Sequence, residues 1–250
     1  MSKWQRINLV AFLVLIFVTV SLIYVLGKAS FSAPFGKPWH LLPAVHEDTL
    51  STIYKNSYQI MGKTPLRATL LDSAKTNVFI LVDAWGVSID ESILSDDFRV
   101  LESISHKFAL HRRLANYTSH AEHAEFRNNF ANNIFLFGGD SLQFNRTDYI
   151  PEIGFQQAIY CQSCPNNMLI DKIDSMLTEP EHPQFVAWTA LASTSGEHNK
   201  IRQTLTQIAD LAKRHPEVRF VVQGTHRPVL CGPETRNSYK AHWVPVAVLN

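Results

Sequence analysis

The sequence carries almost no net charge and no long run of like charges. Its 23 lysines and arginines are matched by 22 aspartates and glutamates, so the formal net charge is +1. Proteins that bind nucleic acid usually have a concentrated basic surface, and this composition does not indicate one. Internal repeats and low-complexity segments are also absent from the 250 residues. We therefore expect one sizeable globular core and no nucleic-acid partner.

Cysteine is scarce as well, with three residues in the chain. Cys161 and Cys164 form a C-x-x-C pair in a polar segment, and no second pair completes a four-ligand zinc site. Outside the cytoplasm this pair is expected to form a local disulfide, which leaves Cys231 single. A redox-active motif is the alternative, although the surrounding sequence does not indicate the β–α–β context of a thioredoxin.

One long apolar run stands out near the N-terminus. Residues 9–26 contain no charge, and as a helix they would extend roughly 27 Å, close to the hydrocarbon thickness of a bilayer. We expect residues 1–27 to be a transmembrane signal-anchor. It would cross the inner (plasma) membrane once and leave the rest of the chain in the periplasm or otherwise outside the cytoplasm. A cleaved signal peptide is the alternative, but its apolar core is usually only about 7–15 residues long.

Behind the anchor, residues 28–75 are expected to form a tether with a short helix, and residues 76–250 a folded domain. Apolar runs rich in β-branched residues alternate there with segments of helical spacing. This alternation predicts an α/β fold, with a mainly parallel sheet sandwiched by helices. Strands are predicted over residues 77–82, 133–137, 184–189, 219–223 and 244–249, and helices over residues 90–108, 167–177 and 199–215.

Polar residues follow several of the predicted strands. Asp83 ends the first strand, Thr194 lies just past the strand at 184–189, and Thr225 and His226 end the strand at 219–223. Ligands of such sheets bind at the carboxyl ends of the strands. A carboxylate and an imidazole that converge there are common ligands of a divalent metal. The sequence therefore predicts that Asp83 and His226 meet at one edge of the sheet.

The order of these segments resembles a known family. NVFILVDAWGVSID at 77–90, Phe-Asn-Arg at 144–146 and the strand at 221–228 resemble motifs of the sulfatase-like branch of the alkaline phosphatase superfamily. The pattern is closest to lipoteichoic acid synthases and to phosphoglycerol and phosphoethanolamine transferases. The resemblance implies an alkaline-phosphatase-like fold over roughly residues 75–250. It also implies a divalent metal (Mn, Mg or Zn) on Asp83, Thr225 and His226, and substrate binding by Arg146 and by Thr194 or His198.

The sequence departs from that family at two positions that catalysis requires. The family's nucleophilic threonine lies four residues before a Glu-Phe pair, which here is Ala121, whereas a three-residue shift gives Thr118. The second metal carboxylate is replaced by Thr225, whose neutral hydroxyl is a weaker ligand for a hard cation. His120, Glu122, His123 and Glu125 are four potential ligands within six residues. They could form a relocated metal centre, with His120 and His123 on one face of a helix, or could simply be solvated residues at a helix start.

Three hypotheses about function follow from these observations. One is a membrane-anchored extracytoplasmic domain that is catalytically degenerate and acts in envelope assembly or modification, with the lipid bilayer and a membrane protein as partners. The alternative is an active metal-dependent transferase or hydrolase of phosphate or sulfate esters on envelope glycans or lipids, with Thr118 as its nucleophile. Because two catalytic requirements fail together, the sequence favours the degenerate module. The third hypothesis is that the chain is a general membrane-anchored adaptor.

Overall fold

The computed structural model describes residues 49–62, 65–113, 117–139, 150–162, 164–192 and 197–250. The expected anchor, residues 28–48 of the expected tether, Arg146 and Thr194 lie outside these ranges. Among the described residues, no helix has the length and apolar character needed to span a bilayer. Glu47–Asn250 clusters as one compact unit, and its fold is described below.

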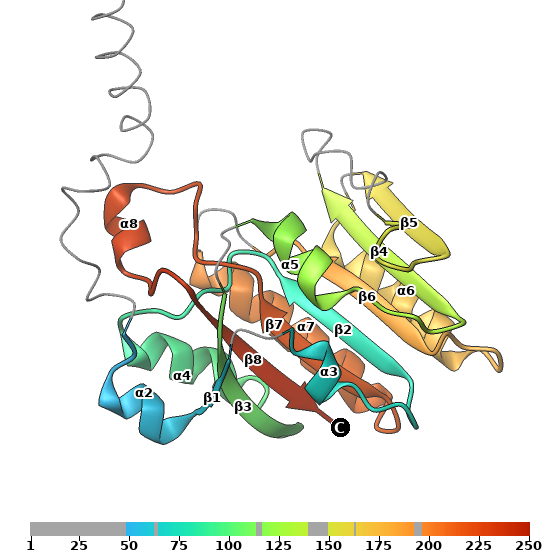
Figure 1. Ribbon diagram of the computed structural model, residues 1–250, viewed down its shortest axis with the longest axis horizontal. Coiled ribbons are helices and arrows are strands. Elements are labelled where there is room, and N and C mark those ends of the chain that lie inside the picture. Colours follow the sequence, from blue (N-terminus) through green and yellow to red (C-terminus); the bar gives the residue numbers. More distant parts are fainter. Residues whose placement is uncertain (1–48, 63–64, 114–116, 140–149, 163, 193–196) are drawn as a thin grey trace, which may run out of the picture. The chain divides into compact units, whose positions relative to one another are not determined.

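An eight-stranded sheet forms the centre of this unit (Figure 1). Its strand order is β1-β3-β8-β7-β2-β6-β4-β5, and β8 runs antiparallel to both of its neighbours while the other pairs are parallel. The prediction of a mainly parallel sheet is therefore confirmed. The strands are β1 (Gln59–Met61), β2 (Asn77–Val82), β3 (Ser105–Arg112), β4 (Asn133–Gly139), β5 (Gln157–Gln162), β6 (Phe185–Ala190), β7 (Arg219–Gly224) and β8 (Trp243–Leu249).

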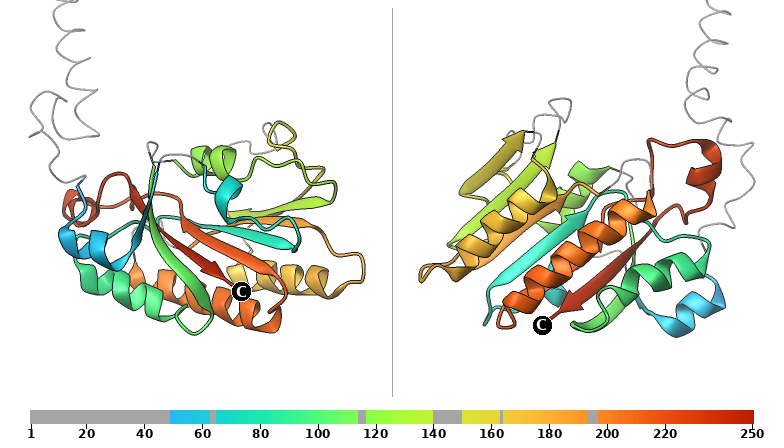
Figure 2. Two further views of the ribbon diagram at one scale, coloured as in Figure 1. Left: turned by 60° about the horizontal axis from the view of Figure 1, so that its bottom comes forward. Right: turned by 180° about the vertical axis from the view of Figure 1, so that it is seen from behind.

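Helices cover both faces of the sheet (Figure 2). One apolar cluster packs side chains of α4, α6 and α7 against one face, and a second packs side chains of α3 and α5 against the other. Two-sided burial is what a parallel sheet requires, because neither of its faces is polar. The described helices are α2 (Thr52–Ser57), α3 (Arg67–Leu70), α4 (Glu91–Arg99), α5 (Thr118–Glu125), α6 (Asn166–Thr178), α7 (His198–Arg214) and α8 (Pro233–Asn237).

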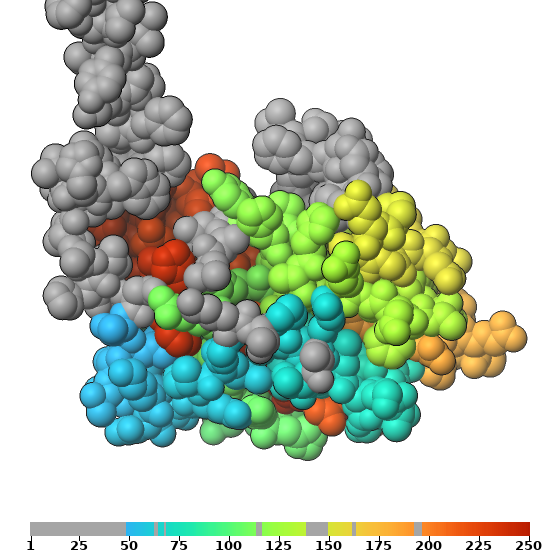
Figure 3. Space-filling view, viewed as in Figure 1, coloured from blue at the N-terminus to red at the C-terminus, as the bar shows by residue number. Residues whose placement is uncertain are grey.

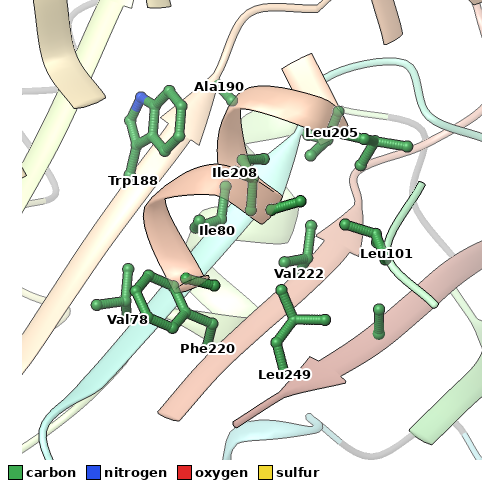
Figure 4. Close-up of a cluster of buried hydrophobic side chains, with 14 of the residues drawn as sticks. Val78, Ile80, Leu101, Trp188, Ala190, Leu205, Ile208, Phe220, Val222 and Leu249 are labelled. Atoms are coloured by element: carbon green, nitrogen blue, oxygen red, sulfur yellow. The ribbon is translucent and has the colours of Figure 1, made fainter. Parts of the chain in front are cut away.

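The central strand β2 shows why the sequence folds this way. All six of its residues are buried, so that Val78 and Ile80 face the α7 side while Phe79 and Leu81 face the α5 side. Figure 4 shows Ile80 beside Ile208 of α7, and Val78 further along the strand beside Phe220 of β7. The amphipathic spacing of α7 supplies the matching apolar stripe. These elements bring the carboxyl end of β2 to the centre of one sheet edge.

The helix predicted over residues 90–108 is wrong in its second half. α4 ends at Arg99, a turn follows, and residues 105–112 form β3 between β1 and β8. Apolar residues at 101, 104 and 108 fit a helical spacing, but the buried residues Ala109 and Leu110 lie in a strand that pairs with β1 and with the distant strand β8. The spacing of apolar residues within one segment does not indicate which distant strand that segment pairs with. β1 likewise extends the sheet to residues before the boundary expected at 76.

Candidate functional site

Asp83 and His226 meet at the carboxyl edge of the sheet. Asp83 directly follows β2, and His226 lies two residues beyond β7, which is paired in parallel with β2. Both side chains are buried, and Asp83 Oδ1 lies 3.4 Å from His226 Nε2. The sequence-based prediction that these two groups share one sheet edge is confirmed.

Thr118 brings a hydroxyl to the same point. It is the first residue of α5, and its Oγ1 donates a hydrogen bond of 2.6 Å to Asp83 Oδ1. The same oxygen lies 3.2 Å from His226 Nε2. Ala121, one turn further along α5, is buried in the apolar cluster on this face of the sheet. The structure thus places Thr118, and not Ala121, beside Asp83 and His226.

The backbone fixes which nitrogen of His226 can accept a proton. His226 Nδ1 lies 2.7 Å from the carbonyl oxygen of Arg227. A carbonyl oxygen only accepts, so Nδ1 must carry the hydrogen of this bond. In the neutral ring Nε2 is then the unprotonated nitrogen, and its lone pair is the one beside Thr118.

Thr225 fills the position where the resemblance expects a second carboxylate. Its fully buried Oγ1 donates to Asp83 Oδ1 at 3.1 Å and accepts from the backbone N–H of Ala84 at 3.1 Å. Ala84 has a φ of 54°, an unusual value for a residue with a side chain. The hydroxyl therefore joins the turn after β2 to the turn after β7, and it uses both its hydrogen and a lone pair to do so.

The acidic residues of α5 point into the protein and away from solvent. Glu125 accepts from Arg113 Nη2 at 3.1 Å and from the backbone N–H of Leu66 at 2.7 Å, with His111 Nε2 at 3.5 Å. Burial raises the pKa of Glu125, but the hydrogen bond from His111 and the charge of Arg113 outweigh it and hold the pKa below its usual range. Glu122, also buried, accepts from Thr189 Oγ1 at 2.6 Å. Sequence reasoning missed these partners.

His120 and His123 lie on the exposed side of α5, opposite Glu122 and Glu125. The His120 ring contacts Tyr117 edge-on, with the ring centroids 5.5 Å apart. The parts of the chain that the structure describes hold no group of three or more His, Cys, Asp or Glu able to bind a metal ion. The geometry thus gives no support to a relocated metal centre on α5.

His198, the expected substitute for a substrate-binding histidine, is the first residue of α7. Its Nε2 lies 3.0 Å from the Tyr239 hydroxyl, and the two rings stack with centroids 5.8 Å apart. Burial, followed by the nearby Arg202 charge, lowers the pKa of His198. Tyr239 in turn borders Gly86, where an added Cβ would lie 3.2 Å from the tyrosine ring. His198 is therefore linked through Tyr239 to the turn that follows Asp83.

A buried carboxyl group of α4 supports the turn that follows Asp83. Asp97 accepts hydrogen bonds of 3.1 Å from Trp85 Nε1 and from Arg202 Nε. Burial raises the pKa of Asp97 to about 6, even though its bonds to Arg202 and Trp85 act in the opposite direction. Asp97 of α4 thus connects Arg202 of α7 to Trp85, which lies two residues after Asp83.

This raised pKa makes stability depend on pH. Between about pH 4 and 6 the folded state holds the Asp97 proton more tightly than the unfolded chain, so the free energy of unfolding falls as pH rises through this window. Asp97→Asn should remove that contribution, which is at most about 1.4 kcal/mol per pH unit. Denaturant unfolding of both proteins at several pH values measures it. Asp96→Asn, on the half-exposed neighbour, is the control and should keep the wild-type slope. Equal slopes for Asp97→Asn and wild type would contradict the assignment.

The donor atoms that the described residues bring to the site do not fit a resident divalent metal. Among those residues, Asp83 and His226 are the two strong ligands, and the hydroxyls of Thr118 and Thr225 are neutral. Zinc sites take at least three ligands from Cys, His, Asp or Glu, and Mg²⁺ or Mn²⁺ prefers carboxylate oxygens. The Thr225 hydroxyl is already committed to Asp83 and Ala84. The expected Mn, Mg or Zn ion therefore has too few anionic ligands among the described residues.

Comparison with known proteins identifies the fold. A protein of the alkaline phosphatase superfamily from Vibrio parahaemolyticus matches with a TM-score of 0.51 and 12% identity over 75% of this chain and 65% of that chain. The lipoteichoic acid synthase LtaP from Listeria monocytogenes matches with a TM-score of 0.49 and 8% identity, over 71% and 65%. The periplasmic domain of EptC from Escherichia coli, solved in complex with Zn, matches at 0.47 and 9%, over 75% and 77%.

The first of these matches shows that the chain has the fold of the alkaline phosphatase superfamily, which confirms the fold that the sequence resemblance predicted. The chain spans 65% of the length of that Vibrio protein. No protein-family model matches the sequence, and no curated protein matches it either. The likeness therefore lies in the fold.

Proposed function

We propose that this chain is a sulfatase-like, membrane-anchored domain outside the cytoplasm that has lost metal-dependent ester chemistry. In this proposal it acts in the assembly or modification of the cell envelope, beside a membrane protein partner. The observation that carries the proposal is the position of Thr225. Its hydroxyl, at the position where the family resemblance implies a metal carboxylate, bonds to Asp83 and to the backbone of Ala84.

With a threonine at position 225, the described site has little negative charge to hold a divalent cation. A divalent cation in oxygen coordination is held mainly by anionic ligands, and its affinity is tuned by their number. Asp83 supplies one negative charge here, and Thr118 and Thr225 already share its Oδ1. A metal would have to break these bonds and would receive one carboxylate in return. The cluster is thus suited to holding two turns and a helix end together.

The proposed location rests on two features. The apolar run over residues 9–26 is long enough to cross a bilayer. Cys161 and Cys164 are joined by a disulfide, which persists in oxidising compartments. Both features agree with an anchored domain in the periplasm or another extracytoplasmic space.

Restoring the missing charge tests the proposal. Thr225→Asp is expected to bind Mn²⁺ or Zn²⁺ at one ion per chain, at least about tenfold more tightly than the wild type, because it returns a second anionic ligand to the site. Titration calorimetry on the full chain in detergent measures this. Thr225→Asn, of similar size but neutral, is the matched control and should gain nothing. One tightly held ion per wild-type chain would refute the proposal.

A second function is favoured by the position of Thr118. Its Oγ1 donates a hydrogen bond to Asp83 Oδ1 and lies 3.2 Å from His226 Nε2, so a carboxylate and an imidazole both lie beside one hydroxyl, as beside an activated nucleophile. In this function one of these two groups takes the hydroxyl proton while the other orients the group. On this reading the chain is an ester transferase or hydrolase acting on a phosphate or sulfate ester of an envelope glycan or lipid.

Turnover separates the two functions. The wild-type full chain is assayed with a chromogenic phosphodiester and a chromogenic sulfate ester, with and without added Mn²⁺, Mg²⁺ or Zn²⁺. Hydrolysis that Thr118→Val abolishes would replace the first proposal with the second. Absence of turnover under every condition, in a protein that unfolds cooperatively, supports the degenerate domain.

A further inference from the structure

The C-x-x-C pair lies at a strand-to-helix turn inside a β–α–β unit. β5 ends at Gln162, α6 begins at Asn166, and the chain then enters β6. β5 and β6 both run parallel to β4, which lies between them. Cys161 and Cys164 are therefore at the carboxyl edge of a parallel sheet, the edge where such folds place reactive groups. The expectation that no β–α–β context surrounds the pair is therefore wrong.

The surroundings of the pair are partly open and apolar. Cys161 and Cys164 are both partly exposed. Tyr160 and Met168, on either side of them along the chain, expose 47% and 54% of their surfaces. β5 is the last of the described strands at its end of the sheet and has no charged residue, and it lies at the rim of the face seen in Figure 3 (yellow). An extended polypeptide with apolar side chains could lie along this rim.

The two sulfurs differ in their electrostatic surroundings. Cys164 lies two residues before the 13-residue helix α6, whose N-cap residue Pro165 offers no side-chain hydrogen bond to the first turn. The unpaired N–H groups at a helix N-terminus favour negative charge and stabilise a nearby thiolate. Cys161, at the end of β5, packs against the apolar core cluster and lacks that stabilisation. Cys164 is therefore the better leaving group of the pair.

We propose that Cys161 and Cys164 form a thiol–disulfide exchange site that oxidises a dithiol in an extended polypeptide. A substrate thiolate attacks Cys161 Sγ, the Cys161–Cys164 bond breaks, and Cys164 leaves as a thiolate. The second substrate thiolate then attacks the substrate sulfur of the mixed disulfide and releases Cys161. The substrate loses two electrons and gains a disulfide, while the C-x-x-C pair gains two electrons and becomes a dithiol.

A purely structural disulfide is the competing explanation. The bond closes a loop between residues only three positions apart, and stabilisation by cross-linking is smallest for the shortest loops. The flanking strand and helix are already fixed by pairing with β4 and by packing of α6 on the sheet. The pair thus adds little constraint to a region that the fold holds in place.

The test uses the full oxidised chain in detergent with Cys231→Ser, which removes the third thiol. A reduced synthetic peptide with two cysteines flanked by apolar residues is the probe. The intact pair is expected to oxidise the peptide at least tenfold faster than the same protein with Cys161→Ser and Cys164→Ser. Mass spectrometry after alkylation should show two new protein thiols for each oxidised peptide. Thermal unfolding of both proteins should give midpoints that differ little.

Absence of peptide oxidation by the folded, intact pair would overturn the proposal. So would a bond that reduced glutathione opens only after the protein unfolds, because that result defines a structural disulfide. Both measurements use the protein with its cysteine pair intact, so they decide the question even if the serine variant does not fold. Neither depends on Thr118 or Thr225, and the outcome is therefore separate from that of the metal titration.

Discussion

Arg113→Ala is expected to destabilise the domain by about 3–5 kcal/mol. Arg113 and Glu125 are both buried, and Arg113 Nη2 lies 3.1 Å from Glu125 Oε1. Removing the guanidinium leaves a carboxylate inside the protein without its opposite charge, and such half-broken buried pairs are costly. Denaturant unfolding of the full chain, followed by tryptophan fluorescence, gives the free energy.

An exposed ion pair supplies the control for this experiment. Arg99 and Asp96 lie 3.0 Å apart on α4, where the Arg99 side chain is 70% exposed. Because water and salt screen such pairs, Arg99→Ala should cost less than about 1 kcal/mol. Similar losses in Arg99→Ala and Arg113→Ala would show that the buried pair carries no special weight. Glu125 also fixes the far end of α5, so Arg113→Ala should loosen the helix that positions Thr118.

Gly224→Ala is the second change with a large expected effect. A Cβ at this position would lie 1.8 Å from the carbonyl oxygen of Trp85, which is backbone and cannot rotate away. The turn after β7 must then move from the turn after β2, and the bonds of Thr225 to Asp83 and Ala84 must lengthen. We expect a loss of about 3 kcal/mol, at the upper end of the cost of overpacking.

Gly232→Ala is the matched control, because a Cβ there meets nothing within 4 Å. Its effect on the free energy of unfolding should stay within about 0.5 kcal/mol, as for other unconstrained surface positions. Thermal unfolding of the two variants provides the comparison. A Gly224→Ala protein as stable as Gly232→Ala would show that the two turns do not pack as closely as the structure indicates.

The parts of the fold that the sequence predicts are those with strong local signals. β2, β6 and β7 are continuous apolar runs, and α7 has a clear apolar stripe, so each can be located without knowledge of its neighbours. β3 and β5 are different, because their apolar content is modest. β3 pairs with β1 and with the distant strand β8, and β5 pairs with β4 at the end of the sheet. Their place in the sheet depends on tertiary pairing, which overrides local propensity.

Some residues of the candidate site can likewise be placed from the sequence, and others cannot. Asp83 and His226 can be placed together because strand-end residues of a parallel sheet gather at one edge, and the structure confirms this. The choice between Thr118 and Ala121 depends on where α5 begins, and helix boundaries are poorly defined by sequence. The contact between Glu122 and Thr189 could not be foreseen, because the sequence does not show that Glu122 lies on the buried side of α5, next to β6.

The antiparallel direction of β8 has a consequence for how this site can vary. β7 leaves the sheet at the carboxyl edge, and β8 re-enters at the same edge, where Arg113 N–H bonds to the His242 carbonyl and Val87 N–H to that of Trp243. The connection that carries α8 therefore begins and ends beside Asp83 and His226. Insertions or deletions in it would reshape the rim of the site while the sheet register stays intact.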